Sequence, residues 1–180
     1  MIIAIGGLTG SGKNTVGELV AKKLGYRLVC PTFKDLAKRG GITLMEFQKK
    51  AENDPDIDKK FDAELREQAK GNCVVTTWLG PWMVEADLRI WVFVPLDIRA
   101  QRVADRDGIT LEEAKKHILA RDESNRQRYL KLYNIDIYNQ DIFDVCINNG
   151  KMTPEEAVKM VLVMIKAMGT KKGAKIKRKK

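Results

Sequence analysis

The N-terminal stretch MIIAIGGLTGSGKNTVGELVAKKLG constrains the fold of this chain more than any other segment. Residues 1–7 form a continuous apolar run broken by glycines, which is typical of a strand buried on both faces of a parallel sheet. From Lys13 to Leu24 the apolar residues recur at helical spacing, and Gly25 follows as a C-terminal stop. The order strand, glycine-rich loop, helix predicts the first unit of an α/β protein.

Further strands and helices are predicted to alternate along the rest of the chain. Apolar runs predict strands at 26–30, 73–78, 88–95 and 144–148. Helical patterns occupy 33–38, 43–53, 55–69, 97–106, 110–130 and 153–168, with Thr43, Asp97, Thr110 and Thr153 as expected N-caps. This alternation favours a three-layer α/β/α fold with a five-stranded parallel sheet. We expect the polar stretches 35–70 and 107–135 to be helical excursions that close over a ligand at the rim of the sheet.

The composition favours a single soluble domain over residues 1–168. The chain has 180 residues, of which 44% are hydrophobic and 32% charged. No apolar run approaches the roughly 20 residues that a membrane helix needs, and the N-terminal run lacks the basic flank of a signal peptide, so we expect a cytoplasmic protein. Cys30, Cys73 and Cys146 are widely spaced without a CxxC pair, which indicates reduced thiols rather than disulfides or a zinc site.

The formal net charge of +9 is concentrated in the last twelve residues. Residues 169–180, GTKKGAKIKRKK, hold seven basic residues and no acidic one, and without them the chain is nearly balanced at 26 basic against 24 acidic residues. We therefore expect a basic, disordered tail. Two interpretations of it stay open with equal weight: a solubilising end, or an electrostatic contact with RNA.

The glycine-rich loop has the composition of a polyphosphate site. Gly7, Gly10 and Gly12 allow backbone N–H groups to converge on one point, and the following helix adds its N-terminal dipole. The spacing from Gly7 through Gly12 to Lys13 meets the Walker pattern, in which the lysine reaches the outer phosphates. The predicted phosphate-binding residues are Gly7, Leu8, Thr9, Gly10, Ser11, Gly12, Lys13, Asn14 and Thr15.

Asn14 departs from this pattern, because a magnesium-binding Ser or Thr is usual at its position. Thr15 offers a hydroxyl one residue later and is the predicted Mg2+ ligand. The GKxT order resembles that of adenylate kinases and other nucleoside monophosphate kinases, which favours a working loop. No Asp ends the third strand after CVVTT, so a second metal ligand is not predicted.

Apart from its tail, the chain resembles the small archaeal type of cytidylate kinase over nearly its whole length. The resemblance lies in residues 33–62 with the acidic run Asp54, Asp58 and Asp62, in residues 95–108, and in residues 121–148 as the lid and final strand. It implies a P-loop NTPase fold with a nucleoside monophosphate segment and a lid. It also implies ATP and Mg2+ as cofactors and phosphoryl transfer to CMP, and to dCMP.

The predicted lid helix is rich in arginine. Transfer of a γ-phosphoryl group needs cations where charge develops, in a site that excludes water. By resemblance Arg121 and Arg128 join Lys13 as catalytic residues, whereas Lys34, Arg102 and Arg126 are expected to bind substrate. A solvated helix face balanced by Asp122 and Glu123 is the alternative interpretation of these arginines.

Two departures concern the acceptor site. Trp78 stands near the position where the family has an arginine that holds the monophosphate, and Lys34 replaces an arginine of the FRxLA element. Trp78 and Trp82 could stack on a base, although packing is the usual role of such residues. His117 is expected at the surface. Two other functions stay open: a kinase of AMP, UMP or another small hydroxyl acceptor, and a nucleotide-gated protein that binds RNA through its tail.

Overall fold

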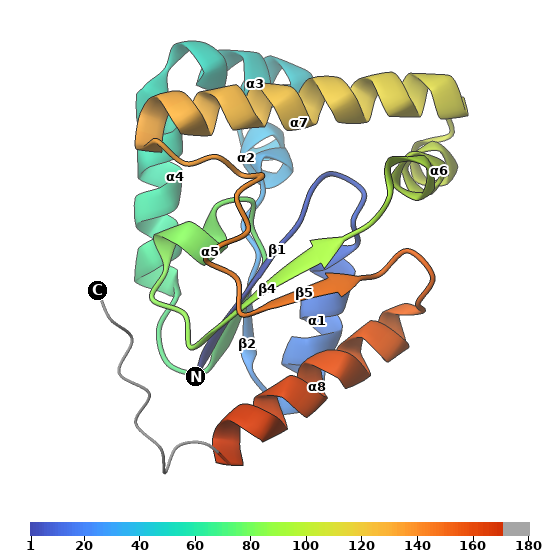
Figure 1. The fold of residues 1–180 in the computed structure, drawn as a ribbon. Coiled ribbons are helices and arrows are strands. Elements are labelled where there is room, and N and C mark those ends of the chain that lie inside the picture. Colours follow the sequence, from blue (N-terminus) through green and yellow to red (C-terminus); the bar gives the residue numbers. More distant parts are fainter. Residues whose placement is uncertain (171–180) are drawn as a thin grey trace.

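A computed structural model describes residues 1–170 of the chain, so the predicted tail lies outside the described residues beyond Thr170. Five parallel strands form one sheet in the order β2-β3-β1-β4-β5 (Figure 1). The strands are β1 (Ile2–Gly6), β2 (Arg27–Val29), β3 (Cys73–Val75), β4 (Leu88–Phe93) and β5 (Val145–Asn148). The helices are α1 (Lys13–Leu24), α2 (Phe33–Arg39), α3 (Leu44–Asn53), α4 (Pro55–Gln68), α5 (Gly80–Met83), α6 (Leu96–Asp107), α7 (Leu111–Tyr133) and α8 (Pro154–Thr170).

Strand β1 is the centre of the sheet because its residues are apolar on both faces. Ile3 pairs with Val74 of β3 on one side and with Leu88 of β4 on the other, and all three are fully buried. Ile3 and Ile5 pack toward α1 and α8, whereas Ala4 packs on the opposite face with Leu65 of α4. The predicted three-layer α/β/α fold is confirmed.

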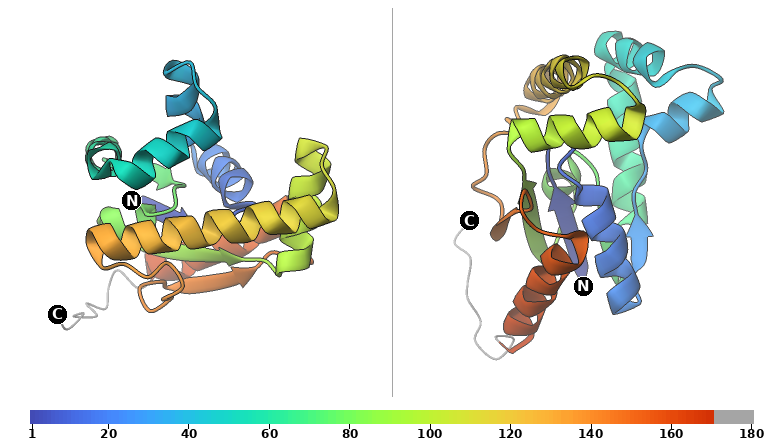
Figure 2. Two further views of the ribbon diagram at one scale, coloured as in Figure 1. Left: turned by 90° about the horizontal axis from the view of Figure 1, so that it is seen from above. Right: turned by 90° about the vertical axis from the view of Figure 1, so that its right-hand side faces the viewer.

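Helices α6 and α7 lie above the carboxyl ends of the strands, where loops of a parallel sheet bind ligands (Figure 1). Seen from above, α7 and α3 lie side by side over this end of the sheet (Figure 2). They are joined by a hydrogen bond in which Ser124 Oγ donates to Glu52 Oε1 at 2.6 Å. The two predicted excursions therefore meet above the strand ends.

Most predicted boundaries agree with the structure within two residues, but one predicted cap is wrong. Thr43 and Thr110 cap their helices with complete capping boxes, as expected. Asp97 does not cap α6, because the helix begins at Leu96 after Pro95. Asp97 lies in the first turn, where its carboxylate suits the positive helix end and lies 2.6 Å from Lys115 Nζ.

Two features were not predicted. Strand β3 ends at Val75, so Thr76–Trp78 leave the sheet and enter the space under α7. Helix α5 is a single turn, too short for any helical periodicity to appear in the sequence. No helix of residues 1–170 is long and apolar enough to span a bilayer.

Candidate active site

The glycine loop, residues 7–12, connects β1 to α1 at the carboxyl end of the sheet. Gly10 and Gly12 have φ angles of +77° and +82°, which favour glycine. A Cβ atom on Gly10 would lie 2.9 Å from the carbonyl oxygen of Arg99. The first turn of α1 leaves backbone N–H groups free and contains no acidic residue. The loop can therefore bind an anion through its backbone.

A buried ion pair fixes the outer end of the loop. Arg99 Nη1 lies 2.6 Å from Asp122 Oδ2 and donates a second hydrogen bond to the Thr9 carbonyl oxygen at 3.0 Å. The Thr9 N–H donates to Asp122 Oδ1 at 3.2 Å. Because both charged side chains are buried, the loop is held in shape by α6 and α7 before any ligand binds.

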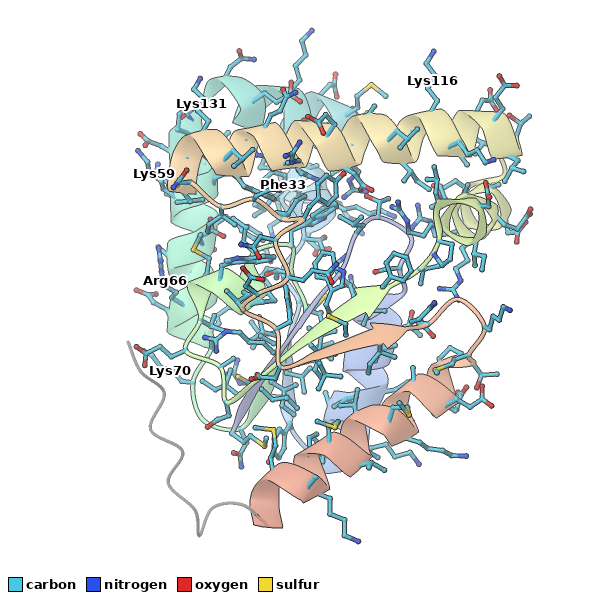
Figure 3. All side chains as sticks on the ribbon, in the orientation of Figure 1. Phe33, Lys59, Arg66, Lys70, Lys116 and Lys131 are labelled. Carbon is cyan, nitrogen blue, oxygen red and sulfur yellow. The ribbon has the colours of Figure 1, made fainter. Side chains whose placement is uncertain are left out.

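A cavity with about 620 Å³ of empty space, part of it open to solvent, lies between the start of α1, the end of β3 and helices α2, α3, α4 and α7. Figure 3 shows Phe33, which lines the cavity, beneath α7, and shows Lys116 pointing away on the outer side of that helix.

Lys13 and Arg121 supply the positive charge of the cavity. Burial, and secondly the nearby Arg121, lowers the pKa of Lys13 to about 8. The Lys13 ammonium lies 5.5 Å from the ring centre of Trp78. Burial also lowers the pKa of Arg121, and no carboxylate of residues 1–170 forms an ion pair with it. Two cations that face one cavity and have no ion-pair partner within the described part of the chain can bind an anion.

The opposite end of the cavity holds two buried carboxylates. Arg128 Nε lies 3.0 Å from Asp58 Oδ2, and the guanidinium lies 5.2 Å from the ring centre of Phe33. Asp62 Oδ2 accepts a hydrogen bond from Tyr133 Oη at 2.7 Å. Burial raises the pKa of both carboxyl groups, that of Asp62 to about 6. This end offers hydrogen-bond acceptors beside an aromatic ring.

Comparisons with known proteins assign this arrangement to a family. Residues 2–151 match the model of the cytidylate kinase-like family. The chain belongs to this family. It is 43% identical over 169 residues to the cytidylate kinase of Pyrococcus horikoshii, covering 92% of this chain and 88% of that protein. It is 40% identical over 172 residues to the cytidylate kinase of Methanobrevibacter smithii, covering 93% of this chain and 100% of that protein.

Among solved structures, the fold is similar to that of deoxyadenosine kinase from M. mycoides, solved with the products dCMP and dCDP. The TM-score is 0.55 at 17% identity, and the match covers 93% of this chain and all of the other. At this identity the likeness establishes the P-loop kinase fold. The dCMP and dCDP are ligands of that deoxyadenosine kinase.

The cavity brings together part of the residue set expected of a cytidylate kinase-like protein. Lys13, Asn14, Arg121 and Arg128 line it. Arg102 lies outside it and donates to the carbonyl oxygens of Ser11 and Asn149 at 3.3 and 2.8 Å, on the other side of the glycine loop.

Two further predicted substrate-binding residues do not reach the cavity. Arg126 donates two hydrogen bonds, at 3.0 and 2.9 Å, to the carboxylate of Asp136, and its guanidinium lies 5.2 Å from the ring centre of Tyr138. Lys34 is exposed on α2 and does not line the cavity. Neither cation is placed to bind an acceptor phosphate in this structure.

The residues that depart from the family pattern take different positions. Trp78 lines the cavity beside Lys13, whereas Trp82 packs on Trp91 and Phe143 with ring centres 6.5 and 5.2 Å away. Thr15 is exposed, while Asn14 Oδ1 is buried and has no hydrogen-bond partner among residues 1–170. His117 is exposed, as predicted.

Sequence reasoning noted Asp58 and Asp62 but assigned them no role in the site. A signal for them exists in the sequence, because Asp58, Asp62, Leu65 and Ala69 recur at spacings of four, three and four, which place them on one face of α4 and of its C-cap. Leu65 and Ala69 belong to the core. Carboxylates that continue the apolar stripe of a helix are thus predicted to be buried, and buried carboxylates often mark functional sites.

Proposed function

We propose that this chain is an ATP-dependent kinase that transfers the γ-phosphoryl group of ATP to CMP, and to dCMP. The observation that carries the proposal is that Lys13 and Arg121, which form no ion pair with a carboxylate of residues 1–170, face one cavity with the buried carboxylates Asp58 and Asp62. Phosphate groups are complementary to the cations at the Lys13 end of this cavity. A nucleotide base that donates hydrogen bonds is complementary to the carboxylates at the other end. The relatives named cytidylate kinase support CMP as the acceptor.

The glycine loop would hold the donor. Its N–H groups and the first turn of α1 would bind the β- and γ-phosphates. The Lys13 ammonium would stabilise the negative charge of the phosphoryl group during transfer. An oxygen of the acceptor phosphate forms a bond to the γ-phosphorus as the bond to the departing ADP oxygen breaks. The products are ADP and CDP.

Arg121 would act on the group in transfer. Negative charge spreads over the three equatorial oxygens of the γ-phosphoryl group in the transition state, and a desolvated guanidinium stabilises it more than water does. Mg2+, when bound with ATP, would neutralise charge on the β- and γ-phosphates. No general base is required, because positioning and electrostatics supply most of the rate enhancement.

The acceptor base would lie at the carboxylate end. Cytosine presents an exocyclic amino group, which donates hydrogen bonds, where uracil presents a carbonyl oxygen. Asp58 and Asp62 are hydrogen-bond acceptors, so they favour an amino edge over a carbonyl edge. Phe33 offers a ring face to the base.

A panel of acceptors tests the proposal directly. ADP formation is measured with ATP, Mg2+ and each of CMP, dCMP, UMP, AMP and GMP at equal concentration. The expected result is that CMP and dCMP are the best acceptors. If another monophosphate is phosphorylated faster, the base assignment is wrong, and if none is, the enzyme class is wrong.

A further inference from the structure

Asn14 has a buried side-chain oxygen with no partner. It follows Lys13 in the first turn of α1 and lines the cavity. Its Oδ1 atom is shielded from solvent and accepts no hydrogen bond from residues 1–170. Leaving a buried acceptor unpaired is unfavourable, so such an atom calls for an explanation, and an ion that binds there is one.

Thr76 provides a second oxygen of the same kind. It is the first residue after β3, its side chain is 1% exposed, and its Oγ1 atom also has no partner among the described residues. Its backbone is fixed, because its N–H donates to the Val29 carbonyl oxygen at 3.0 Å. The hydroxyl is therefore held in place, with the weakly hydrogen-bonding thiol of Cys30 as its neighbour.

Packing brings the side chain of Thr76 against helix α1, near the end at which Asn14 lies. A Cβ atom on Gly17 would lie 2.0 Å from Thr76 Cγ2, so the Thr76 side chain rests directly on the backbone of α1. Asn14 lies three residues before Gly17 and shares the same side of that helix. Asn14 and Thr76 both line the cavity that Lys13 lines, whereas the exposed Thr15 does not.

We propose that Asn14 Oδ1 and Thr76 Oγ1 are the protein ligands of the Mg2+ ion that accompanies the donor nucleotide, in place of the Thr15 hydroxyl. Mg2+ prefers oxygen ligands and is usually held by few protein groups together with phosphates and water. The inference rests on the proposed function, because the nucleotide phosphates complete the coordination.

Neutral ligands have a consequence that carboxylates would not have. An amide and a hydroxyl bring no negative charge, and Lys13 adds a positive one nearby, so the empty site attracts Mg2+ weakly. The phosphates supply the charge that holds the ion. Binding of metal and nucleotide is therefore coupled, and each raises the affinity for the other by the same factor.

Calorimetry with the non-hydrolysable β,γ-imido analogue of ATP tests the assignment. The dissociation constant is measured once with excess Mg2+ and once in EDTA, and the ratio reports the coupling. Asn14→Ala and Thr76→Val are expected to reduce this ratio by roughly tenfold or more, as for loss of a metal-site partner, with the value in EDTA nearly unchanged. Asn14→Ser, which keeps an oxygen, restores part of the coupling.

Thr15→Val is the matched control, because it removes the neighbouring hydroxyl without changing side-chain size. Its coupling ratio is expected to equal that of the wild type. The assignment is overturned if Thr15→Val lowers the ratio while Asn14→Ala and Thr76→Val keep it, or if folded variants of all three keep it. Absence of nucleotide binding by the wild type in EDTA and in Mg2+ alike would instead count against the proposed function. Thermal unfolding confirms that each variant is folded.

Discussion

Arg99 of α6 and Asp122 of α7 form a buried ion pair with 2.6 Å between Nη1 and Oδ2, and both side chains hold the main chain of Thr9. Helices α6 and α7 are thus joined to the glycine loop by buried charged side chains. The alternative interpretation of the α7 arginines places Asp122 on a solvated face, but Asp122 is buried, with 1% of the residue exposed. A buried pair of this kind fixes the position of the loop more than it adds stability.

Replacing Asp122 by alanine is expected to destabilise the protein by about 3–5 kcal/mol, because Arg99 is left buried without a counter-ion. Urea denaturation measures the change. Asp107→Ala is the matched control, since Asp107 pairs with Arg106 at the surface, and its cost should stay below about 1 kcal/mol. Equal effects of the two substitutions would contradict the structural role of the buried pair.

Removing either unpaired cation should impair catalysis without unfolding the protein. Lys13→Ala and Arg121→Ala are each expected to lower kcat by about 100-fold or more, because each removes a charge that stabilises the transition state. Steady-state kinetics with ATP and CMP measure the effect. Lys116→Ala serves as the control, since Lys116 is exposed on the outer side of α7, and it should leave kcat unchanged (Figure 3). A kcat near the wild-type value for Arg121→Ala would exclude its proposed role.

Asp62 should make stability depend on pH. Burial, more than the neighbouring Asp58, raises its pKa to about 6 in the folded state, against the opposing effects of Tyr133, Arg66 and Arg128. The unfolded chain releases this proton near pH 4, so the free energy of unfolding falls as the pH rises from about 4 to 6 and stays lower above.

Asp62→Asn removes this titration. The variant is expected to be more stable than the wild type by about 2–3 kcal/mol at pH 7.5, with the difference vanishing below pH 4. Denaturation at a series of pH values measures it. A difference that does not change with pH would show that Asp62 is not the group responsible. The same variant should bind CMP more weakly, because the carboxylate is part of the proposed acceptor site.

Deleting residues 171–180 should leave kcat/KM for CMP unchanged, because the residues that line the cavity lie between Lys13 and Tyr129. The deletion removes seven positive charges, so any salt-sensitive retention of RNA should be lost with it. Filter binding at low salt and kinetics on the same preparation test both statements. A large loss of kcat/KM would show that residues 171–180 contribute to catalysis.

The first unit of the fold could be predicted because β1, the glycine loop and α1 are contiguous and each follows a strong local pattern. The arginines of α7 were predicted less accurately, because their roles depend on which face of the helix each one occupies. Arg121 and Arg128 are seven residues apart and share a face, whereas Arg126 is turned away from Arg121 by about 140°. Helical geometry alone could thus have separated Arg126 from the other two.

Long-range partners could not be predicted. Asp58 and Arg128 meet across 70 positions of sequence, and Thr76 meets α1 because of the strand order. The sequence predicts a working loop despite Asn14, but it could not show that Asn14 Oδ1 is buried and Thr15 exposed. That difference depends on how α1 packs against the end of β3.

The central claim is that the cavity moves a phosphoryl group from ATP to CMP, and ATP radiolabelled at its γ-phosphorus tests it most directly. Incubation with CMP and Mg2+ is expected to move the label into CDP, at a rate that Lys13→Ala lowers by about 100-fold or more. Label that stays in ATP, or is released as inorganic phosphate at the same rate with and without CMP, would contradict it.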